Sequence, residues 1–176
     1  MKKKILFIMG VSGSGKSTVA ESISSLLSYI YIDADDYHPE ANIAKMKHNI
    51  PLNDVDRQPW LDALNTMATA CIDSNENLVI ACSCLKPEYR KILQAGIQES
   101  CLFVYLKGSF EVISERMKKR GEHYFNGDSM LRSQFDTLIE PSTNEPIDYI
   151  EVSILENDIN AVVELTVKNL RELNYV

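Results

Sequence analysis

The sequence predicts an α/β fold in which a five-stranded parallel sheet is flanked by helices on both faces, with a small lid. Short apolar runs alternate along the chain with stretches of helical periodicity, and the first and third runs are apolar throughout, as central parallel strands are. The length of 176 residues suits one domain with a single core. The expected strands are residues 4–9, 29–32, 78–82, 101–106 and 149–153.

Composition excludes several classes of protein. A net charge of −7 argues against a protein whose main role is to bind nucleic acid, because that role needs a basic face. The four cysteines show no C-x-x-C pair, so we expect reduced core residues rather than a structural metal site. The apolar run after Lys2–Lys4 is too short for a signal peptide, and no run is long enough to span a membrane. We therefore expect a cytoplasmic protein that binds no membrane.

The segment that follows the first strand has the pattern of a P-loop. Its sequence, G-V-S-G-S-G-K-S, lies between a strand and a helix, which is the context this motif requires. Glycines let the backbone close around phosphates with its N–H groups pointing inward. We expect Lys16 to reach the β- and γ-phosphates of ATP and the Ser17 hydroxyl to ligate Mg²⁺. The predicted nucleotide-binding residues are Gly10, Val11, Ser12, Gly13, Ser14, Gly15, Lys16, Ser17 and Thr18.

A group of carboxylates follows the second strand, at the end where ligands bind in open α/β sheets. If the chain stays extended there, Asp33 and Asp35 point together toward the P-loop and Asp36 points away. One of the pair would hold Mg²⁺ and the other would orient or deprotonate an acceptor hydroxyl. No aspartate follows the third strand, which strengthens the metal role of Asp33 or Asp35. The alternative is a helix cap in a solvated turn.

The polar segment 39–60 is expected to be mostly irregular, with the next helix beginning at Trp60. Several of its side chains, Asp56 and Arg57 among them, are able to hydrogen-bond a polyol. A loop of this length in a compact domain usually has a function, although Asp56 could simply cap the helix that follows. We therefore expect an acceptor-binding segment at about residues 36–60.

Two pairs of cations are expected near the same edge of the sheet. Lys86 and Arg90 have i, i+4 spacing at the start of the helix after the third strand, so they share one face, unless that face is ordinary basic surface. Arg116 and Arg120 lie one turn apart and would neutralise charge on a transferring phosphoryl group, or would only complement the helix dipole. The segment 121–128 contains glycine and aromatic residues and is interpreted as a lid that excludes water.

Motifs spread over most of the chain, from about Ile5 to Pro141, carry a resemblance to a known family. They are Gly10–Ser17, Asp33–Pro39, Asn42–Met46, Pro51–Asp54, Asp56–Arg57, Pro59–Trp60, Cys82–Ser83, Leu85–Lys86, Tyr89–Arg90, Tyr105–Gly108, Gln134–Phe135 and Glu140–Pro141. Together they resemble gluconokinase, the P-loop gluconate kinase family related to shikimate and adenylate kinases. The middle motifs are specific, whereas the P-loop alone would indicate only a superfamily.

The resemblance implies transfer of the γ-phosphoryl group of ATP to the 6-hydroxyl of D-gluconate, with Mg²⁺ as cofactor and a homodimer as the assembly. It implies Ser17 and Asp33 near the metal and Asp35 at the acceptor hydroxyl. The implied catalytic residues are Lys16, Asp35, Arg116 and Arg120. The candidates that hold gluconate, besides Asp35, are His38, Arg57, Lys86 and Arg90. The alternatives are a kinase for another small hydroxy acid, such as shikimate, and a non-catalytic ATP-binding sensor.

Overall fold

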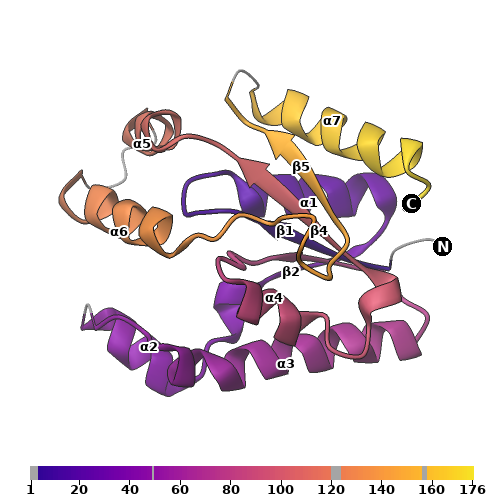
Figure 1. The fold of residues 1–176 in the computed structure, drawn as a ribbon, viewed down its shortest axis with the longest axis horizontal. Helices are drawn as coiled ribbons and strands as arrows, with labels where there is room; N and C mark the ends of the chain where they lie inside the picture. The colour runs from indigo at the N-terminus through magenta and orange to yellow at the C-terminus, as the bar shows by residue number, and fades with distance from the viewer. Residues whose placement is uncertain (1–3, 49, 120–123, 156–157) are drawn as a thin grey trace.

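Five parallel strands form one sheet in the computed structural model, which describes residues 4–48, 50–119, 124–155 and 158–176 (Figure 1). The strands lie in the order β2-β3-β1-β4-β5, so β1 is central and β2 is an edge strand. The predicted parallel sheet is confirmed. The strands are β1 Ile5–Met9, β2 Ile30–Asp33, β3 Leu78–Ala81, β4 Cys101–Lys107 and β5 Tyr149–Ser153.

Helices cover both faces of the sheet, as predicted (Figure 1). Helices α1 and α7 lie on one face, α3 and α4 lie on the other, and α2, α5 and α6 lie beyond the carboxyl ends of the strands. The α-helices are α1 Lys16–Leu27, α2 Glu40–Lys47, α3 Asp54–Asp73, α4 Pro87–Leu93, α5 Phe110–Lys119, α6 Tyr124–Thr137 and α7 Ile159–Glu172. Two short 3₁₀ helices, η1 Ala34–Tyr37 and η2 Gln98–Ser100, complete the described elements.

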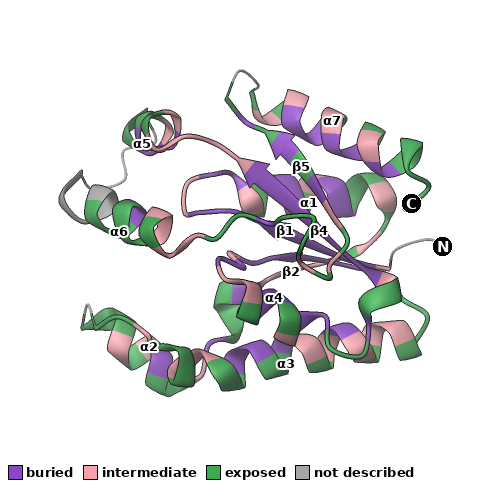
Figure 2. Ribbon diagram, viewed as in Figure 1, coloured by how far each residue is buried: buried purple, intermediate pink, exposed green. Residues whose placement is uncertain are grey.

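The central strand β1 contributes to two hydrophobic cores, because successive side chains of a strand point to opposite faces of the sheet. Leu6 and Ile8 pack into the core under α1 and α7, whereas Ile5, Phe7 and Met9 pack into the core under α3 and α4. All five side chains are fully buried, as the burial colours of Figure 2 show for the strand as a whole. The apolar run before the P-loop therefore anchors the loop to the most buried part of the protein.

The polar segment 39–60 is more helical than the sequence predicts. Helix α3 begins at Asp54 rather than at Trp60. The cause is a capping box, in which the Asn53 side chain accepts from the N–H of Asp56 at 2.9 Å and the Asp56 side chain accepts from the N–H of Asn53 at 3.1 Å. Pro59 has no N–H to donate to the carbonyl oxygen of Val55, four residues earlier in the helix. Pro59 is tolerated because Val55 is 81% exposed in the first turn, where water can bind that oxygen.

The predicted lid lies partly outside the described residues. Arg120 and residues 121–123 belong to that undescribed part. From Tyr124 onward the backbone is helical and belongs to α6, so the expectation of a loop through residue 128 is corrected for residues 124–128. Helix α6 packs against α5 (Figure 1).

Three further features were compared with the class of protein that the composition indicates: the state of the cysteines, possible metal-holding groups and the character of the helices. Cys82, Cys84 and Cys101 are buried, Cys71 is partly buried, and none of the four forms a disulfide. Within the described ranges, no group of three or more His, Cys, Asp or Glu side chains is arranged to hold a metal ion. In the same ranges, no helix has the length and apolar character needed to cross a membrane.

Candidate active site

The P-loop and the acidic turn meet at the carboxyl ends of β1 and β2, two strands that are separated in the sheet by β3. Ala81 of β3 pairs with Ile8 of β1 on one side and with Asp33 of β2 on the other, so the segments after β1 and β2 begin at the same level. The Ser17 hydroxyl then donates a hydrogen bond to Oδ2 of Asp33 at 2.7 Å. The structure thus brings together two of the segments that the sequence assigned to donor and acceptor.

Two glycines of the P-loop are required by the way the loop packs. Gly13 has φ +78° and Gly15 has φ +98°, conformations that L-residues rarely adopt. A Cβ on Gly13 would lie 2.6 Å from Cγ of Met117, and one on Gly15 would lie 2.8 Å from Cδ1 of Ile159. The loop therefore packs against α5 and α7 without room for a side chain at Gly13 or Gly15.

The ammonium group of Lys16 lies inside the loop. Its Nζ donates to the carbonyl oxygen of Val11 at 3.0 Å. Burial lowers the pKa of Lys16, and the nearby carboxylates of Asp35 and Asp33 offset part of that effect. A cation that has already lost much of its hydration is held beside two acidic groups, which suits it to a highly charged ligand.

The atoms of the loop fit a bound triphosphate with Mg²⁺. Ser14 Oγ is buried and has no hydrogen-bond partner among the described residues, and such an atom normally has one. The Ser17 hydroxyl and the Asp33 carboxylate supply the oxygen ligands that Mg²⁺ prefers, and Mg²⁺ commonly needs only one or two carboxylates beside phosphate oxygens. The described residues contain no group of three or more acidic, His or Cys side chains that could hold a metal ion. This does not conflict with a Mg²⁺ ion that is bound largely by the nucleotide.

The acidic turn differs from the extended segment that the sequence predicts. Residues 34–37 form the 3₁₀ helix η1, and Asp33 is its N-cap, with Oδ1 accepting from the N–H of Asp35 at 3.1 Å. Asp33 and Asp35 therefore do not point the same way along a strand. Asp33 faces Ser17, whereas the Asp35 side chain is 87% exposed. Asp33 therefore caps a helix, as the alternative expects, and it also contacts Ser17 of the P-loop.

His38 lies behind Asp35 instead of on the open edge. Its side chain is only 5% exposed and stacks on Trp60, with ring centroids 4.3 Å apart. Asn42 Nδ2, which donates to the carbonyl oxygen of Asp56, lies 3.4 Å from Nδ1 of His38, so Nδ1 is the acceptor and Nε2 carries the proton. That Nε2 lies 3.9 Å from Oδ1 of Asp35. Burial lowers the pKa of His38, which favours this neutral ring.

A second polar group surrounds the ring of Tyr89. Arg57 and Lys86 lie over that ring at 5.8 Å and 5.3 Å from its centroid. The Tyr89 hydroxyl donates to Oδ1 of Asp54 at 2.5 Å, and Lys86 Nζ donates to the same oxygen at 2.8 Å. These two hydrogen bonds lower the pKa of Asp54. Two predicted substrate-binding cations are thus brought to one aromatic ring, at the ends of α3 and α4.

The prediction that Arg90 shares this open face is wrong. Lys86 is the N-cap of α4, whereas Arg90 is fully buried beneath the helix. Nε and Nη2 of Arg90 donate to the two carboxylate oxygens of Glu145 at 2.7 Å and 2.6 Å, and Nη1 donates to the carbonyl oxygen of Cys84 at 2.8 Å. These internal partners give the Arg90 guanidinium a structural role in this arrangement and direct it away from the face that carries Lys86.

Arg116 anchors the other side of the site. Its Nη2 donates to the carbonyl oxygen of Ile154 at 2.5 Å, which links α5 to the segment after β5. Met117, the next residue, packs against the P-loop at Gly13. Arg116 therefore lies on the helix that supports the loop, while Arg120 is outside the described residues.

Three polar residues at the site received no individual role from the sequence: Asp54, Tyr89 and Gln134. The first two form the cluster with Lys86, and the Gln134 side chain accepts a hydrogen bond from the N–H of Ser12 at 2.6 Å. All three lie within motifs that carry the family resemblance. That resemblance is the signal that singles them out, because a lone Asp, Tyr or Gln on a helix is otherwise unremarkable.

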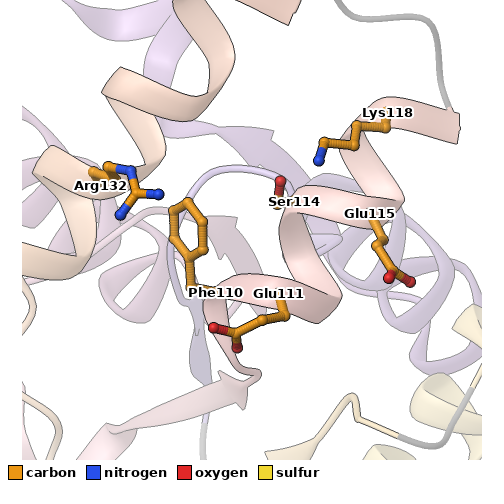
Figure 3. A pocket seen from close by; sticks show the side chains of 6 residues that line it. All are labelled: Phe110, Glu111, Ser114, Glu115, Lys118 and Arg132. Atoms are coloured by element: carbon orange, nitrogen blue, oxygen red, sulfur yellow. The ribbon is translucent and has the colours of Figure 1, made fainter.

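A pocket of about 420 Å³ opens between α5 and α6 (Figure 3). Its walls carry side chains of both charges, and Arg132 of α6 lies beside the ring of Phe110 of α5 (Figure 3). It includes none of the residues predicted to bind nucleotide or acceptor. The lining residues are Phe110, Glu111, Ser114, Glu115, Lys118 and Arg132.

Comparison with known proteins identifies the family. The family model described as Shikimate kinase matches residues 12–171. The thermoresistant gluconokinase of Escherichia coli (strain K12) is 44% identical over 168 residues, covering 96% of this chain and 94% of that protein. The chain belongs to the gluconokinase family. The gluconokinase of Arabidopsis thaliana, at 38% identity over 179 residues, covers 95% of this chain and 94% of its own length.

Solved structures agree with the gluconokinase family. The crystal structure of a gluconokinase from Sinorhizobium meliloti 1021 matches with a TM-score of 0.87 at 36% identity, covering 98% of this chain and 95% of that one. The resemblance read from the motifs and the P-loop kinase fold are therefore both confirmed. The roles of single residues rest on the geometry described above.

Proposed function

We propose that this chain transfers the γ-phosphoryl group of ATP to the 6-hydroxyl of D-gluconate, giving 6-phospho-D-gluconate and ADP. The hydrogen bond between Ser17 and Asp33 carries the proposal, because it joins the P-loop to the acidic turn that would present the acceptor. The gluconokinase relatives support gluconate as that acceptor. The proposal does not depend on any role for Arg90.

On the donor side, the P-loop would hold the triphosphate through its backbone N–H groups. Lys16 would leave the carbonyl oxygen of Val11 and contact the β- and γ-phosphates. The remaining residues proposed to contact the nucleotide are Gly10, Ser12, Gly13, Ser14, Gly15, Ser17 and Thr18. Arg116, with Arg120, would neutralise charge on the transferring group.

Ser17 and Asp33 would hold Mg²⁺ through their side-chain oxygens, which already lie 2.7 Å apart. Bound there with the nucleotide, Mg²⁺ would neutralise negative charge on the phosphate oxygens. Asp33 also remains the N-cap of η1, so the same carboxylate would fix the turn that carries Asp35.

On the acceptor side, Asp35 would act as the general base. A new bond would form between the 6-oxygen of gluconate and the γ-phosphorus, the bond from that phosphorus to the β–γ bridging oxygen would break, and the hydroxyl proton would pass to Asp35. The exposed position of its side chain leaves it accessible to substrate. His38 lies behind Asp35, with Nε2 3.9 Å from Oδ1, so it would support the turn that carries Asp35 rather than contact gluconate through a charged ring.

The gluconate carboxylate requires a cation, and Arg57 and Lys86 are the proposed partners because both lie over the ring of Tyr89. Residues 36–60 and the segment 121–128 are proposed as the acceptor-binding segment and the lid. We also propose that the protein is cytoplasmic and forms a homodimer. Light scattering would test the dimer, which should have twice the chain mass of 19.9 kDa.

An ADP-release assay over a panel of small acids tests this function. With ATP and Mg²⁺, D-gluconate is expected to stimulate ADP release and to yield a product phosphorylated at the 6-oxygen, identified by ³¹P–¹H NMR. Stimulation by shikimate instead of gluconate would replace the acceptor. ATP binding without stimulation by any acid would favour the sensor hypothesis.

A further inference from the structure

One peptide unit of the P-loop is held from two sides. The carbonyl oxygen of Val11 accepts from Lys16 Nζ at 3.0 Å, and the N–H of Ser12, in the same peptide unit, donates to Oε1 of Gln134 at 2.6 Å. Because C=O and N–H point in opposite directions in a trans peptide, Lys16 and Gln134 lie on opposite sides of it. Helix α6 thus contacts the nucleotide loop through the side chain of Gln134.

The turn of α6 that carries Gln134 is fixed in position by aromatic contacts. Arg132 lies over the ring of Phe110 at 4.5 Å (Figure 3), and Phe135 meets the same ring edge-on with centroids 5.8 Å apart. Phe110 begins α5, whose residues Ile113 and Met117 pack on Gly13 of the P-loop. Neighbouring residues of α6 therefore contact both the loop and the helix that supports it.

This arrangement constrains how the loop can change shape. The Gln134 bond fixes the plane of this peptide, so the carbonyl oxygen of Val11 stays on the side away from Gln134 whether or not Lys16 remains bound to it. A peptide unit released from Gln134 would rotate more freely, and a carbonyl oxygen turned toward a phosphate would repel it. The amide oxygen of Gln134 is a neutral acceptor, so it fixes the peptide without adding negative charge beside the loop.

We propose that Gln134 is a positioning residue of the nucleotide site, which holds the Val11–Ser12 peptide in the orientation that receives a triphosphate. This inference rests on the proposed function, in which ATP is the phosphoryl donor. It gives α6 a role in donor binding, separate from any contact with the acceptor.

Two variants test the inference. Gln134→Met keeps the length of the side chain and removes the acceptor, and Gln134→Asn keeps the amide but shortens it by one methylene, so it carries the test if the Met variant does not fold. Asp136→Ala, an exposed position on the same helix, is the matched control. The measurements are the Kd of ATP by calorimetry without gluconate, the KM values of both substrates, kcat and the melting temperature.

One hydrogen bond contributes about 0.5–1.5 kcal/mol net, so we expect the Kd and KM of ATP to rise about 2- to 13-fold, with the KM of gluconate unchanged and Asp136→Ala equal to wild type. A folded Gln134 variant with wild-type ATP affinity, even with a lower melting temperature, would overturn the inference and leave a structural role. Wild-type protein that binds ATP but does not phosphorylate gluconate would overturn the proposed acceptor, while the ATP calorimetry would still decide the role of Gln134.

Discussion

Trp60 donates its indole N–H to the backbone carbonyl oxygen of Ala34 at 2.7 Å, and this bond fastens the turn that carries Asp35 to helix α3. Both residues are buried, so no water replaces the donor if it is lost. Trp60→Phe leaves the oxygen of Ala34 unpaired, and we expect a loss of about 1–3 kcal/mol of unfolding free energy. Because the turn is loosened, kcat should fall as well. Urea unfolding and steady-state kinetics measure the two effects.

The control for Trp60→Phe is the affinity for ATP, which should stay within about twofold of wild type because the P-loop is held by other contacts. A variant with lower stability and an unchanged kcat would show that the Ala34 bond supports the fold without positioning Asp35.

Asp35→Asn should abolish most turnover and leave nucleotide binding intact. The amide keeps the size of the side chain and cannot take up the acceptor proton, and loss of a general base typically costs about 10²- to 10⁴-fold in rate. Asp36→Asn is the matched control, since Asp36 is also an exposed residue of η1 and no catalytic role is proposed for it. Rapid-quench measurement of the phosphorylated product gives the rate, and calorimetry gives the ATP affinity. Equal rates for the two variants would remove Asp35 from the mechanism.

The stability of the protein should fall on acidification through His38. Burial lowers its pKa below the ordinary value of 6.5, Arg57 lowers it further and Asp35 partly opposes them. Between the folded and unfolded pKa values the unfolded chain binds more protons, so the contribution of His38 is fully present above pH 6.5 and is lost as the pH falls toward the lowered value. Urea unfolding at pH 7.5 and 5.5 measures this loss.

His38→Gln is the reference for that experiment, because it keeps a polar side chain and does not titrate. The unfolding free energy of wild type should decrease more than that of the variant between the two pH values. An equal decrease would mean that other groups account for the acid sensitivity.

The sequence predicts those parts of the site that local chemistry dictates. The P-loop is recognisable because its glycines, Lys16 and Ser17 are needed at fixed spacing, and the apolar run before it identifies the central strand. The orientation of Asp33 and Asp35 was missed because it depends on the 3₁₀ turn that Trp60 holds from 26 residues away. The alternation of side chains along a strand, on which the prediction relied, does not indicate such a turn.

The prediction that Arg90 lies on the same face as Lys86 was wrong for a related reason. Its i, i+4 spacing from Lys86 is compatible with one helical face, but α4 begins only at Pro87. The partner that draws the guanidinium inward is Glu145, 55 residues further along the chain. Burial of a cation is decided by such distant partners, which spacing alone does not reveal.

Substitution of Lys86 and Arg90 separates a binding role from a structural one. Lys86→Met should raise the KM of gluconate about tenfold or more, because a charge-assisted contact is worth about 1.5–3 kcal/mol. The melting temperature should change little, because the ion pair of Lys86 with Asp54 is partly exposed. Arg90→Lys loses the paired contact with Glu145, so it should lower the melting temperature and leave the KM of gluconate unchanged. Thermal unfolding and gluconate titrations decide between these roles, and a folded Arg90→Lys variant with a raised KM would return Arg90 to the substrate site.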